Sequence, residues 1–440
     1  MNIAIIGAGL TGLTAAYELQ KKGHTITIFE KEKSAGGLAG GWKEKSWLWP
    51  LEIYYHHFFT SDKEIITLID ELGIKEQTII TRPITATYIP SDQNKKEIYH
   101  LDSALSLLKF DKLSPIDRIR TGIFIGICKV NPWWKPLEKI TTKQFAITIG
   151  GQAGWKTIWE PLMIGKFGSY SDQIPASWLW ARIQKRTTSL GYLTGGFQTL
   201  IDALVHKILA SNGTLFTNTT IHSIVENANH SIKINFSNES NAKQIKNFDK
   251  VIMTTPSATT TKLIKFPTVF EKNLHSIQHL WAQILILETT EPILKDIYWL
   301  NINDRSMPFL ALVAHTNFMD KKYYAGHHIT YIGNYLPEGH PYLSMTKEQL
   351  LNKFMPYIKK INPNFTSHVS HITYHVFSSP SAQPIHTINY SKKAPQFDTP
   401  IPNIYIANMD SIYPFDRGTN YAVALGTVIA SHLTNNQQRN

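Results

Sequence analysis

The hydrophobic pattern begins with a buried strand, an amphipathic helix and a second strand. Residues 2–6 form a short apolar run rich in β-branched side chains, which predicts a buried parallel strand. Apolar residues then recur at helical spacing between Leu13 and Lys22, and Gly23 stands where a helix is expected to end. A second apolar run at 25–29 closes a βαβ unit.

The rest of the chain alternates between two kinds of pattern. A helix with a glycine stop is expected at 64–73, whereas residues 76–191 are irregular and rich in aromatic side chains. Helical and strand patterns return from residue 192, and alternating strands over 257–395 predict an antiparallel sheet. The further expected elements are a helix to Leu209, strands at 214–216, 220–224, 232–236, 250–256, 281–287, 328–332 and 403–408, and a helix at 422–433.

Three glycines follow the first strand directly. Gly7 allows the turn, Gly9 lets the backbone approach a pyrophosphate, and Gly12 lets helix and strand pack closely. The amides and dipole of the following helix favour phosphate charge. Glu30 ends the second strand, where a carboxylate accepts hydrogen bonds from ribose hydroxyls and disfavours a 2′-phosphate. The segment therefore predicts a dinucleotide site, with NADP not expected.

A second glycine pair, Gly36-Gly37, follows Glu30 closely. A strand ending in Glu and then a Gly-Gly pair resembles the flavin-containing amine oxidase superfamily, which includes protoporphyrinogen oxidases, phytoene desaturases and UDP-galactopyranose mutases. The resemblance implies that both glycines bring bare amides to the pyrophosphate of FAD. Many relatives carry Arg after the pair, whereas this chain has Leu38.

The C-terminal strand, turn and helix resemble the second flavin motif of the superfamily. The resemblance implies that a helix N-terminus aimed at the isoalloxazine O2 stabilises the reduced ring. Asp416 is expected to bind a ribityl hydroxyl, and Arg417 to face pyrophosphate or substrate. The alternative is that Asp416 caps the helix and Arg417 is its salt-bridge partner.

The resemblance implies an α/β fold, with a Rossmann-like FAD-binding domain of the GR2 type and an inserted α+β substrate domain. The expected FAD-binding domain comprises 1–75, 192–256 and 396–440, and the substrate domain comprises 76–191 and 257–395. The expected cofactor-binding residues are Gly7, Gly9, Leu10, Thr11, Gly12, Glu30, Lys31, Gly36, Gly37, Leu38, Ile221, Asp416, Arg417, Thr419 and Asn420.

Candidate catalytic residues follow from a local similarity to the mutases. The run from His56 to Lys63 resembles a mutase motif that borders the flavin, so His56 would approach the isoalloxazine. His56, His57 and Arg417 are the candidate catalytic residues, and His315 and Tyr331 are further ring-side candidates. The C-terminal turn departs from the mutase pattern.

Composition limits the alternatives. The single cysteine, Cys128, excludes an internal disulfide and lies far in sequence from the C-terminal flavin motif, so FAD is expected to be noncovalent. We expect no metal, because the histidines are scattered. The net charge of +11 comes without any nucleic-acid-binding module, so no nucleic-acid partner is expected.

Segment 118–139 combines cations, indoles and an apolar run. It fits either a core helix followed by a surface loop, which its poor polar periodicity favours, or a peripheral membrane contact. The chain enters its first strand at once and has no run of 18 apolar residues, so we expect a cytoplasmic protein, in the second case peripheral on the inner face of the membrane.

The sequence thus predicts an FAD-dependent oxidoreductase that dehydrogenates a large apolar or planar small molecule, like protoporphyrinogen oxidase. O₂ or a quinone would be the electron acceptor. The alternatives are a mutase-like enzyme acting on a nucleotide sugar, an amine oxidase, and a non-catalytic carrier on the same fold.

Overall fold

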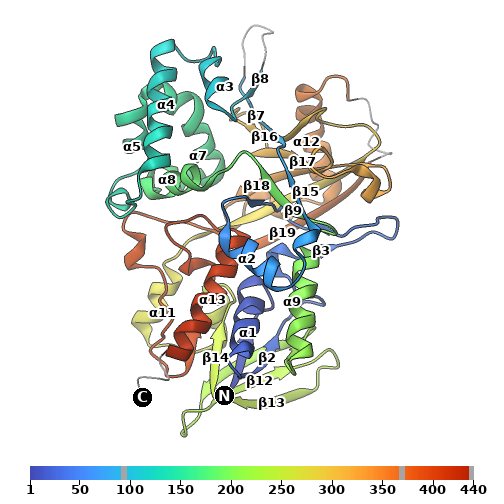
Figure 1. The fold of residues 1–440 in the computed structure, drawn as a ribbon, viewed down its shortest axis with the longest axis vertical. Coiled ribbons are helices and arrows are strands. Elements are labelled where there is room, and N and C mark those ends of the chain that lie inside the picture. The colour runs from blue at the N-terminus through green and yellow to red at the C-terminus, as the bar shows by residue number, and fades with distance from the viewer. Residues whose placement is uncertain (91–96, 366–371, 436–440) are drawn as a thin grey trace.

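A five-stranded parallel sheet forms the core of one end of the molecule (Figure 1). The computed structural model describes residues 1–90, 97–365 and 372–435. The strand order is β10 (Thr214–Phe216), β2 (Thr25–Phe29), β1 (Asn2–Ile6), β14 (Lys250–Met253) and β20 (Ile404–Ile406). Because parallel strands end at the same edge, the turn after β1 lies beside the ends of β2 and β14.

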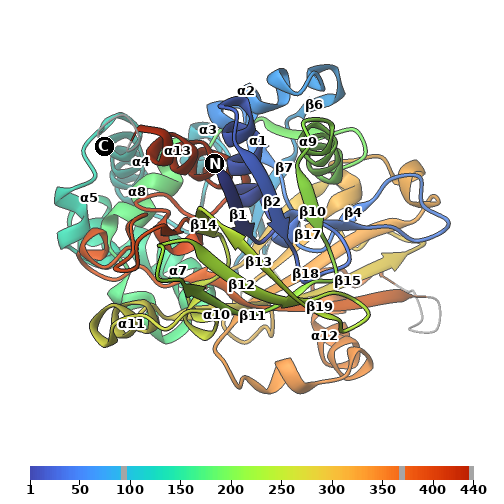
Figure 2. The ribbon, with the colours of Figure 1, turned by 90° about the horizontal axis from the view of Figure 1, so that it is seen from below.

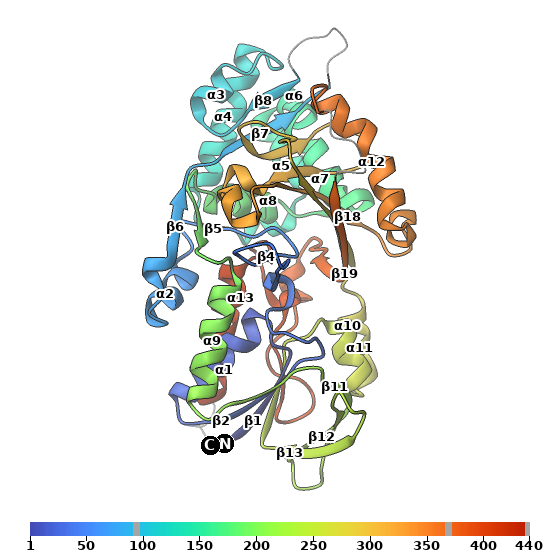
Figure 3. The same ribbon diagram turned by 90° about the vertical axis from the view of Figure 1, so that its right-hand side faces the viewer.

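Different layers cover the two faces of this sheet. Helices α1 (Leu10–Lys21), α9 (Gln198–Ala210) and α13 (Thr419–Asn435) cover one face, and a three-stranded antiparallel sheet covers the other (Figures 2 and 3). That small sheet consists of β11 (Thr220–Glu226), β12 (Ile232–Ser237) and β13 (Lys243–Phe248). Strand β13 carries no apolar strand pattern in the sequence, because most of its side chains are exposed.

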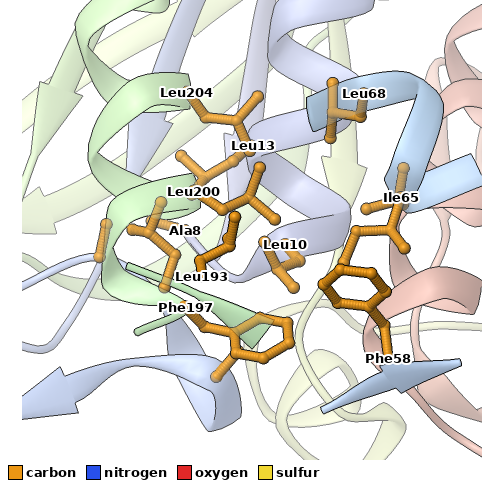
Figure 4. Close-up of a cluster of buried hydrophobic side chains, with 14 of the residues drawn as sticks. Ala8, Leu10, Leu13, Phe58, Ile65, Leu68, Leu193, Phe197, Leu200 and Leu204 are labelled. Carbon is orange, nitrogen blue, oxygen red and sulfur yellow. The ribbon is translucent and has the colours of Figure 1, made fainter. Parts of the chain in front are cut away.

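Apolar side chains hold the helical layer together. Leu10 and Leu13 of α1 face Leu200 and Leu204 of α9, and α2 (Lys63–Glu71) adds Ile65 and Leu68 (Figure 4). Helix α13 crosses α1 closely: a Cβ on Gly426 would lie 2.7 Å from the Thr11 carbonyl oxygen. The start of α13 is thereby held next to the turn after β1.

A seven-stranded sheet forms the second layer. Its order is β19 (Thr373–Pro384), β15 (His279–Thr289), β18 (His328–Leu336), β17 (Ala311–Ala314), β16 (Ile297–Ile302), β7 (Ile84–Tyr88) and β8 (Ile98–His100). The expected antiparallel sheet is present, but the β16–β7 pair is parallel because β7 comes from the earlier segment. Helix α12 (Lys347–Ile361) packs Leu350, Phe354 and Ile358 against one face of the sheet.

Residues 104–185 form a helical lobe rather than irregular structure. Thr141 and Gln144 form a capping box at α5, and Ser114 caps α4 ahead of Pro115. The aromatic side chains Trp155, Trp178 and Trp180 are buried in the lobe. Its helices are α3 (Ala104–Leu108), α4 (Pro115–Val130), α5 (Thr142–Gly150), α6 (Gln152–Gly154), α7 (Glu160–Phe167) and α8 (Ala176–Lys185).

Short elements join the layers. They are β3 (Gly41–Trp42), β4 (Leu51–Glu52), β5 (Phe58–Phe59), β6 (Thr78–Thr81), β9 (Leu190–Leu193), α10 (Ser257–Leu263) and α11 (Thr268–His275). The Rossmann-like parallel sheet and the second α+β layer confirm the predicted fold class. The exact domain boundaries stay a prediction. No helix in the described ranges is both long and apolar enough to cross a bilayer.

Candidate active site

The two glycine clusters meet at the end of β1. The Gly36 amide donates to the Ala8 carbonyl oxygen at 2.8 Å, and Gly9 and Gly36 form a parallel bridge. Gly36 and Gly37 have φ values of +131° and +56°, which favour glycine. Two segments separated in sequence therefore present bare backbone side by side.

The space beside this backbone fits a dinucleotide diphosphate. A Cβ on Gly9 would meet no atom within 4 Å, whereas one on Gly12 would lie 2.1 Å from the Gly7 carbonyl oxygen. Gly9 also begins α1 without any side-chain cap, so the first amides of the helix are free for a ligand. The residues expected to hold the FAD pyrophosphate therefore fit that group. Leu10 and Thr11 belong to this first turn.

Glu30 is fixed at the end of β2. Its carboxylate accepts hydrogen bonds from the amides of Ala8, at 2.8 Å, and Glu32, at 3.0 Å, and the residue is 8% exposed. Lys31 is exposed and pairs with Glu32 at 3.2 Å. Glu30 is therefore positioned toward the glycine turn, whereas the Lys31 side chain lies in solvent.

The other predicted cofactor residues lie in ordered positions. Leu38 belongs to a single helical turn at 37–39, and Ile221 lies in β11, next to an irregularity in its pairing with β12. Thr419 and Asn420 begin α13. The helix thus starts before Ala422, the expected first residue, because Asn420 holds α2: its side chain accepts from the Ile65 amide at 2.9 Å.

Asp416 and Arg417 lie where several elements converge. The Asp416 carboxylate accepts a hydrogen bond from the Lys166 ammonium at 3.0 Å and from the amide of Arg417 at 3.1 Å. The Arg417 guanidinium donates to Gln383 of β19 at 3.1 Å and to the Tyr335 hydroxyl of β18. In this structure Asp416 holds a lysine of α7 and does not cap α13. Its expected role at the ribityl chain stays a prediction.

His56 and His57 follow β4 and are neutral near pH 7. Burial lowers the pKa of His56 to about 4 and that of His57 to about 3. His57 Nδ1 lies 3.1 Å from the Tyr298 hydroxyl, and His56 Nδ1 bonds to the Tyr54 carbonyl oxygen. Since the Tyr54 carbonyl only accepts, His56 carries its proton on Nδ1. Both side chains can orient a ligand, and neither is a cation at neutral pH.

The two further ring-side candidates are enclosed by protein. His315 is 2% exposed and lies 2.8 Å from the Tyr324 hydroxyl. Tyr331 is fully buried and donates to the Glu52 carbonyl oxygen at 2.7 Å. We infer a structural part for both residues.

The segment after β4 lies close to the C-terminal turn, because Tyr54 and Tyr55 both interact electrostatically with Arg417. Tyr54, Tyr55, His56, Tyr335 and Arg417 lie deep in the chain, as the effect of burial on their pKa values shows. All five nevertheless keep partly accessible surface. From this combination of depth and accessibility we infer that the five side chains line an internal space, which we call the recess.

The chain runs from the glycine turn to the residues of the recess. The Ile53 amide donates to the Gly40 carbonyl oxygen at 3.2 Å, and β3 pairs with β4 directly before Tyr54. The chain therefore leads from the diphosphate cradle to the recess, and α13 packs on α1, the helix that starts at that cradle.

Sequence reasoning missed four residues of this recess: Lys166, Arg182, Tyr335 and Gln383. One signal was present, because Lys166 lies between Met163 and Phe167 in a stretch that is otherwise apolar. A lysine at a core position needs a partner. No group of histidine, cysteine or acidic side chains within the described ranges could hold a metal ion.

Comparisons with known proteins cover the whole fold. A family model described as flavin containing amine oxidoreductase matches residues 10–418. The fold is similar to that of a putative protoporphyrinogen oxidase from Exiguobacterium sp. 255-15, with a TM-score of 0.75, 15% identity and 98% of each chain covered. It is also similar to reduced UDP-galactopyranose mutase, with a TM-score of 0.72 and 15% identity over 99% of this chain and 95% of that chain.

Similarity to curated sequences is more local. A probable zeta-carotene desaturase of Synechococcus elongatus is 33% identical over 180 residues, which cover 37% of each chain. Among the first of these relatives, the matched segment spans from 8% to 48% of the relative's own length.

Proposed function

The chain belongs to the flavin-containing amine oxidoreductase family, and on that basis we propose that it dehydrogenates a large apolar or planar organic molecule, as a protoporphyrinogen oxidase does. The family match confirms the superfamily resemblance and FAD as the cofactor. Cys128 is fully buried in the helical lobe, which agrees with noncovalent binding.

The aromatic lining of the recess carries this proposal. The partly exposed Tyr55 ring packs edge-on against the partly exposed Trp299, with centroids 4.9 Å apart, and the fully buried Tyr331 ring supports it at 5.7 Å. The His57 ring lies 6.0 Å from Trp299 and 6.0 Å from the buried Tyr298 ring. A wall of flat, rigid side chains suits a planar or extended apolar ligand.

For this reaction the protein has to position the substrate against the cofactor and exclude water from the site. When bound, FAD supplies a two-electron acceptor, with O₂ or a quinone as the proposed final acceptor. We propose that the substrate is oriented against the cofactor by His56, His57 and Arg417. Neutral histidines accept or donate hydrogen bonds without repelling a cation.

An anaerobic substrate panel tests the proposal. The flavin-loaded protein is mixed with a porphyrinogen, a polyene, a diamine and a UDP-sugar, and the visible flavin absorbance is followed. We expect bleaching by the porphyrinogen at least about tenfold faster than by the diamine, because the recess is walled by aromatic rings. Bleaching by the diamine alone would indicate an amine oxidase and contradict the proposal.

The remaining alternatives give other results in the same experiment. A mutase-like enzyme would show no bleaching by any substrate, and the UDP-sugar would bind to the chemically reduced protein. A carrier would be purified without flavin and would bind an apolar partner.

A second proposal concerns the exposed face of α4. Ile116, Ile119, Ile123 and Val130 are 72%, 57%, 53% and 79% exposed and lie on one stripe of the helix. Trp133 follows and is 73% exposed. Helix α4 lies at the end of the molecule far from the parallel sheet (Figure 1).

Charge indicates the partner of this face. Between residues 105 and 135 six Lys or Arg residues stand against two acidic residues, Asp111 and Asp117. Exposed cations beside an apolar stripe suit an anionic membrane surface. We propose peripheral contact of α4 with such a membrane, and the cytoplasmic location stays a prediction.

Vesicle binding tests this contact. We expect the protein to sediment with vesicles rich in phosphatidylglycerol, and Ile119→Glu combined with Ile123→Glu to weaken this binding about tenfold or more, since two exposed apolar side chains that would enter the membrane surface become charged. Val269→Glu is the control, because Val269 is 75% exposed on α11, away from α4. Equal sedimentation of all three proteins would refute the contact.

A further inference from the structure

Asp416 lies among three cations at the edge of the recess. The Lys166 ammonium of α7 is 3.0 Å from the carboxylate, and the Arg182 guanidinium of α8 is 3.8 Å from it. Arg417 is the next residue in the chain. We name Lys166, Arg182, Arg417 and Asp416 the cationic cluster. Its members come from α7, α8 and the turn before α13, which meet next to β18 and β19 (Figures 1 and 3).

The charges of the cationic cluster do not balance. Within the described ranges, Asp416 is the only carboxylate that forms an ion pair with any of the three cations. Three positive charges therefore share one negative charge at a site where the Lys166 side chain is 8% exposed. Buried charges are ordinarily paired, because desolvation of an unpaired ion is costly. An anion bound at this site would balance the remaining positive charge.

Tyr335 reports the same positive environment. Burial alone raises the pKa of a phenol, yet Arg417 and Lys166 outweigh burial here and lower the pKa of Tyr335 below its ordinary value. The Lys166 ammonium also lies 5.0 Å from the centre of the Tyr335 ring.

Arg182 has donors available for a ligand. Its only ionic contact in the described structure is the long one to Asp416, and its guanidinium lies 5.6 Å from the centre of the Trp178 ring. The side chain is 27% exposed although α8 packs within the helical lobe. Arginine offers a planar fork that matches a carboxylate or a phosphate.

We infer that the substrate carries an anionic group, a carboxylate or a phosphate, which Arg182 and Arg417 bind at the edge of the recess. This inference rests on the proposed function, which places the substrate in that recess. An anionic group on a planar substrate would balance the cluster and fix one end of the molecule while the aromatic wall holds the other. A hydrocarbon polyene would leave the cluster unpaired, and a diamine would be repelled by it.

The aromatic wall and the cationic cluster thus define an amphipathic substrate. Among the named relatives, a porphyrinogen with carboxylate side chains and a sugar diphosphate both meet the anionic requirement. A porphyrinogen, with four pyrrole rings, would offer the aromatic wall more flat apolar surface than the single uracil ring of a UDP-sugar. The two features therefore narrow the proposed substrate class to large organic acids that carry flat rings.

Calorimetry on the flavin-loaded protein tests the subsite without turnover. The probes are glutarate and inorganic pyrophosphate, with putrescine as a cationic probe. We expect both anions to bind and putrescine not to bind. Arg182→Gln should weaken anion binding about tenfold or more, because a charge-assisted hydrogen bond is lost. Arg305→Gln, which removes an exposed arginine elsewhere, should leave it unchanged. The anion that binds more tightly assigns the group.

The variant Arg182→Lys and a measurement of the flavin reduction potential complete the test. Arg182→Lys retains the charge and should weaken anion binding less than Arg182→Gln, so it reports the subsite even if the Gln variant does not fold. If Arg182→Gln changes the flavin reduction potential but not the anion affinity, the cluster serves the cofactor and the inference fails. Equal affinity for putrescine and glutarate would also overturn it.

The subsite and the proposed function can fail separately. Anion binding that depends on Arg182, without bleaching by any porphyrinogen, would retain the subsite and reject the dehydrogenation proposed above. Bleaching by a porphyrinogen, without any anion binding, would support the proposed dehydrogenation and reject the anionic subsite.

Discussion

Gly9→Val will give a folded protein without flavin. A Cβ at Gly9 meets no protein atom within 4 Å, so the side chain fits the apoprotein and occupies the space beside the first amides of α1. A diphosphate needs that space to reach the amides. We expect flavin content to fall from near one per chain to less than about a tenth, with little loss of stability. Visible absorbance of the purified protein and its urea transition measure the two effects.

Two other glycines are the controls for this change. Gly126 of α4 also has open space at its Cβ position, so Gly126→Val should leave flavin content unchanged. Gly12→Ala brings a Cβ within 2.1 Å of the Gly7 carbonyl oxygen and should destabilise the fold itself. A yellow Gly9→Val protein of normal flavin content would contradict the assignment of this turn to the cofactor.

The cofactor end of the molecule was readable in the sequence because its signals are local. The strand at 2–6, the helix that stops at Gly23 and the strand at 25–29 follow from periodicity and glycine positions within one βαβ unit. Each glycine is constrained by neighbours in the same turn or by the adjacent strand end.

The substrate recess was not readable, because its contacts join distant parts of the chain. Lys166 and Asp416 are 250 positions apart, and neither position predicts the other. Arg417 was identified from the C-terminal motif, but its partners Tyr335 and Gln383 lie on β18 and β19, which β15 separates in a sheet whose strand order no pattern gives. Such a site requires the tertiary fold.

Helix α4 shows how a periodic signal can be hidden. One face of the helix buries Thr121, Phe124 and Cys128, while Ile119 and Ile123 lie exposed on the other face. Apolar residues on both faces remove the contrast on which an amphipathic pattern depends. The sequence therefore favoured a simple core helix, and only the structure separates the two faces.

Buried Glu52 is expected to make the free energy of unfolding depend strongly on pH. The residue is 1% exposed, and its carboxyl oxygens accept hydrogen bonds from the Tyr192 hydroxyl and the Phe197 amide, each at 2.6 Å. Burial raises the pKa of Glu52 from 4.5 to about 7, although both hydrogen bonds act to lower it. The folded protein therefore holds a proton that the unfolded chain has already released.

The sign of the effect follows from proton linkage. Between pH 4.5 and about 7 the unfolded chain ionises at Glu52 while the folded protein does not, so this residue lowers the free energy of unfolding as pH rises. The loss amounts to roughly 3 kcal/mol and is complete above the folded pKa. Buried His57 and His315 act in the opposite direction: their pKa values are lowered, so the stability they contribute is lost as pH falls.

Glu52→Gln isolates the contribution of this carboxyl group. The glutamine side chain of the variant cannot ionise, and it keeps an oxygen that accepts from the Phe197 amide. Because the variant and the wild type contain the same histidines, the histidine contributions cancel when the two are compared. We expect the variant's advantage in free energy of unfolding to grow from less than about 1 kcal/mol near about pH 5 to about 3 kcal/mol above about pH 8. Urea transitions across this range measure it, with the exposed Glu348→Gln as control. If the difference in free energy of unfolding between the variant and the wild type stays constant with pH, Glu52 is already ionised in the folded protein. That result would require a cation or a water molecule beside the carboxylate. The described contacts instead fill this position with Tyr192 and the start of α9.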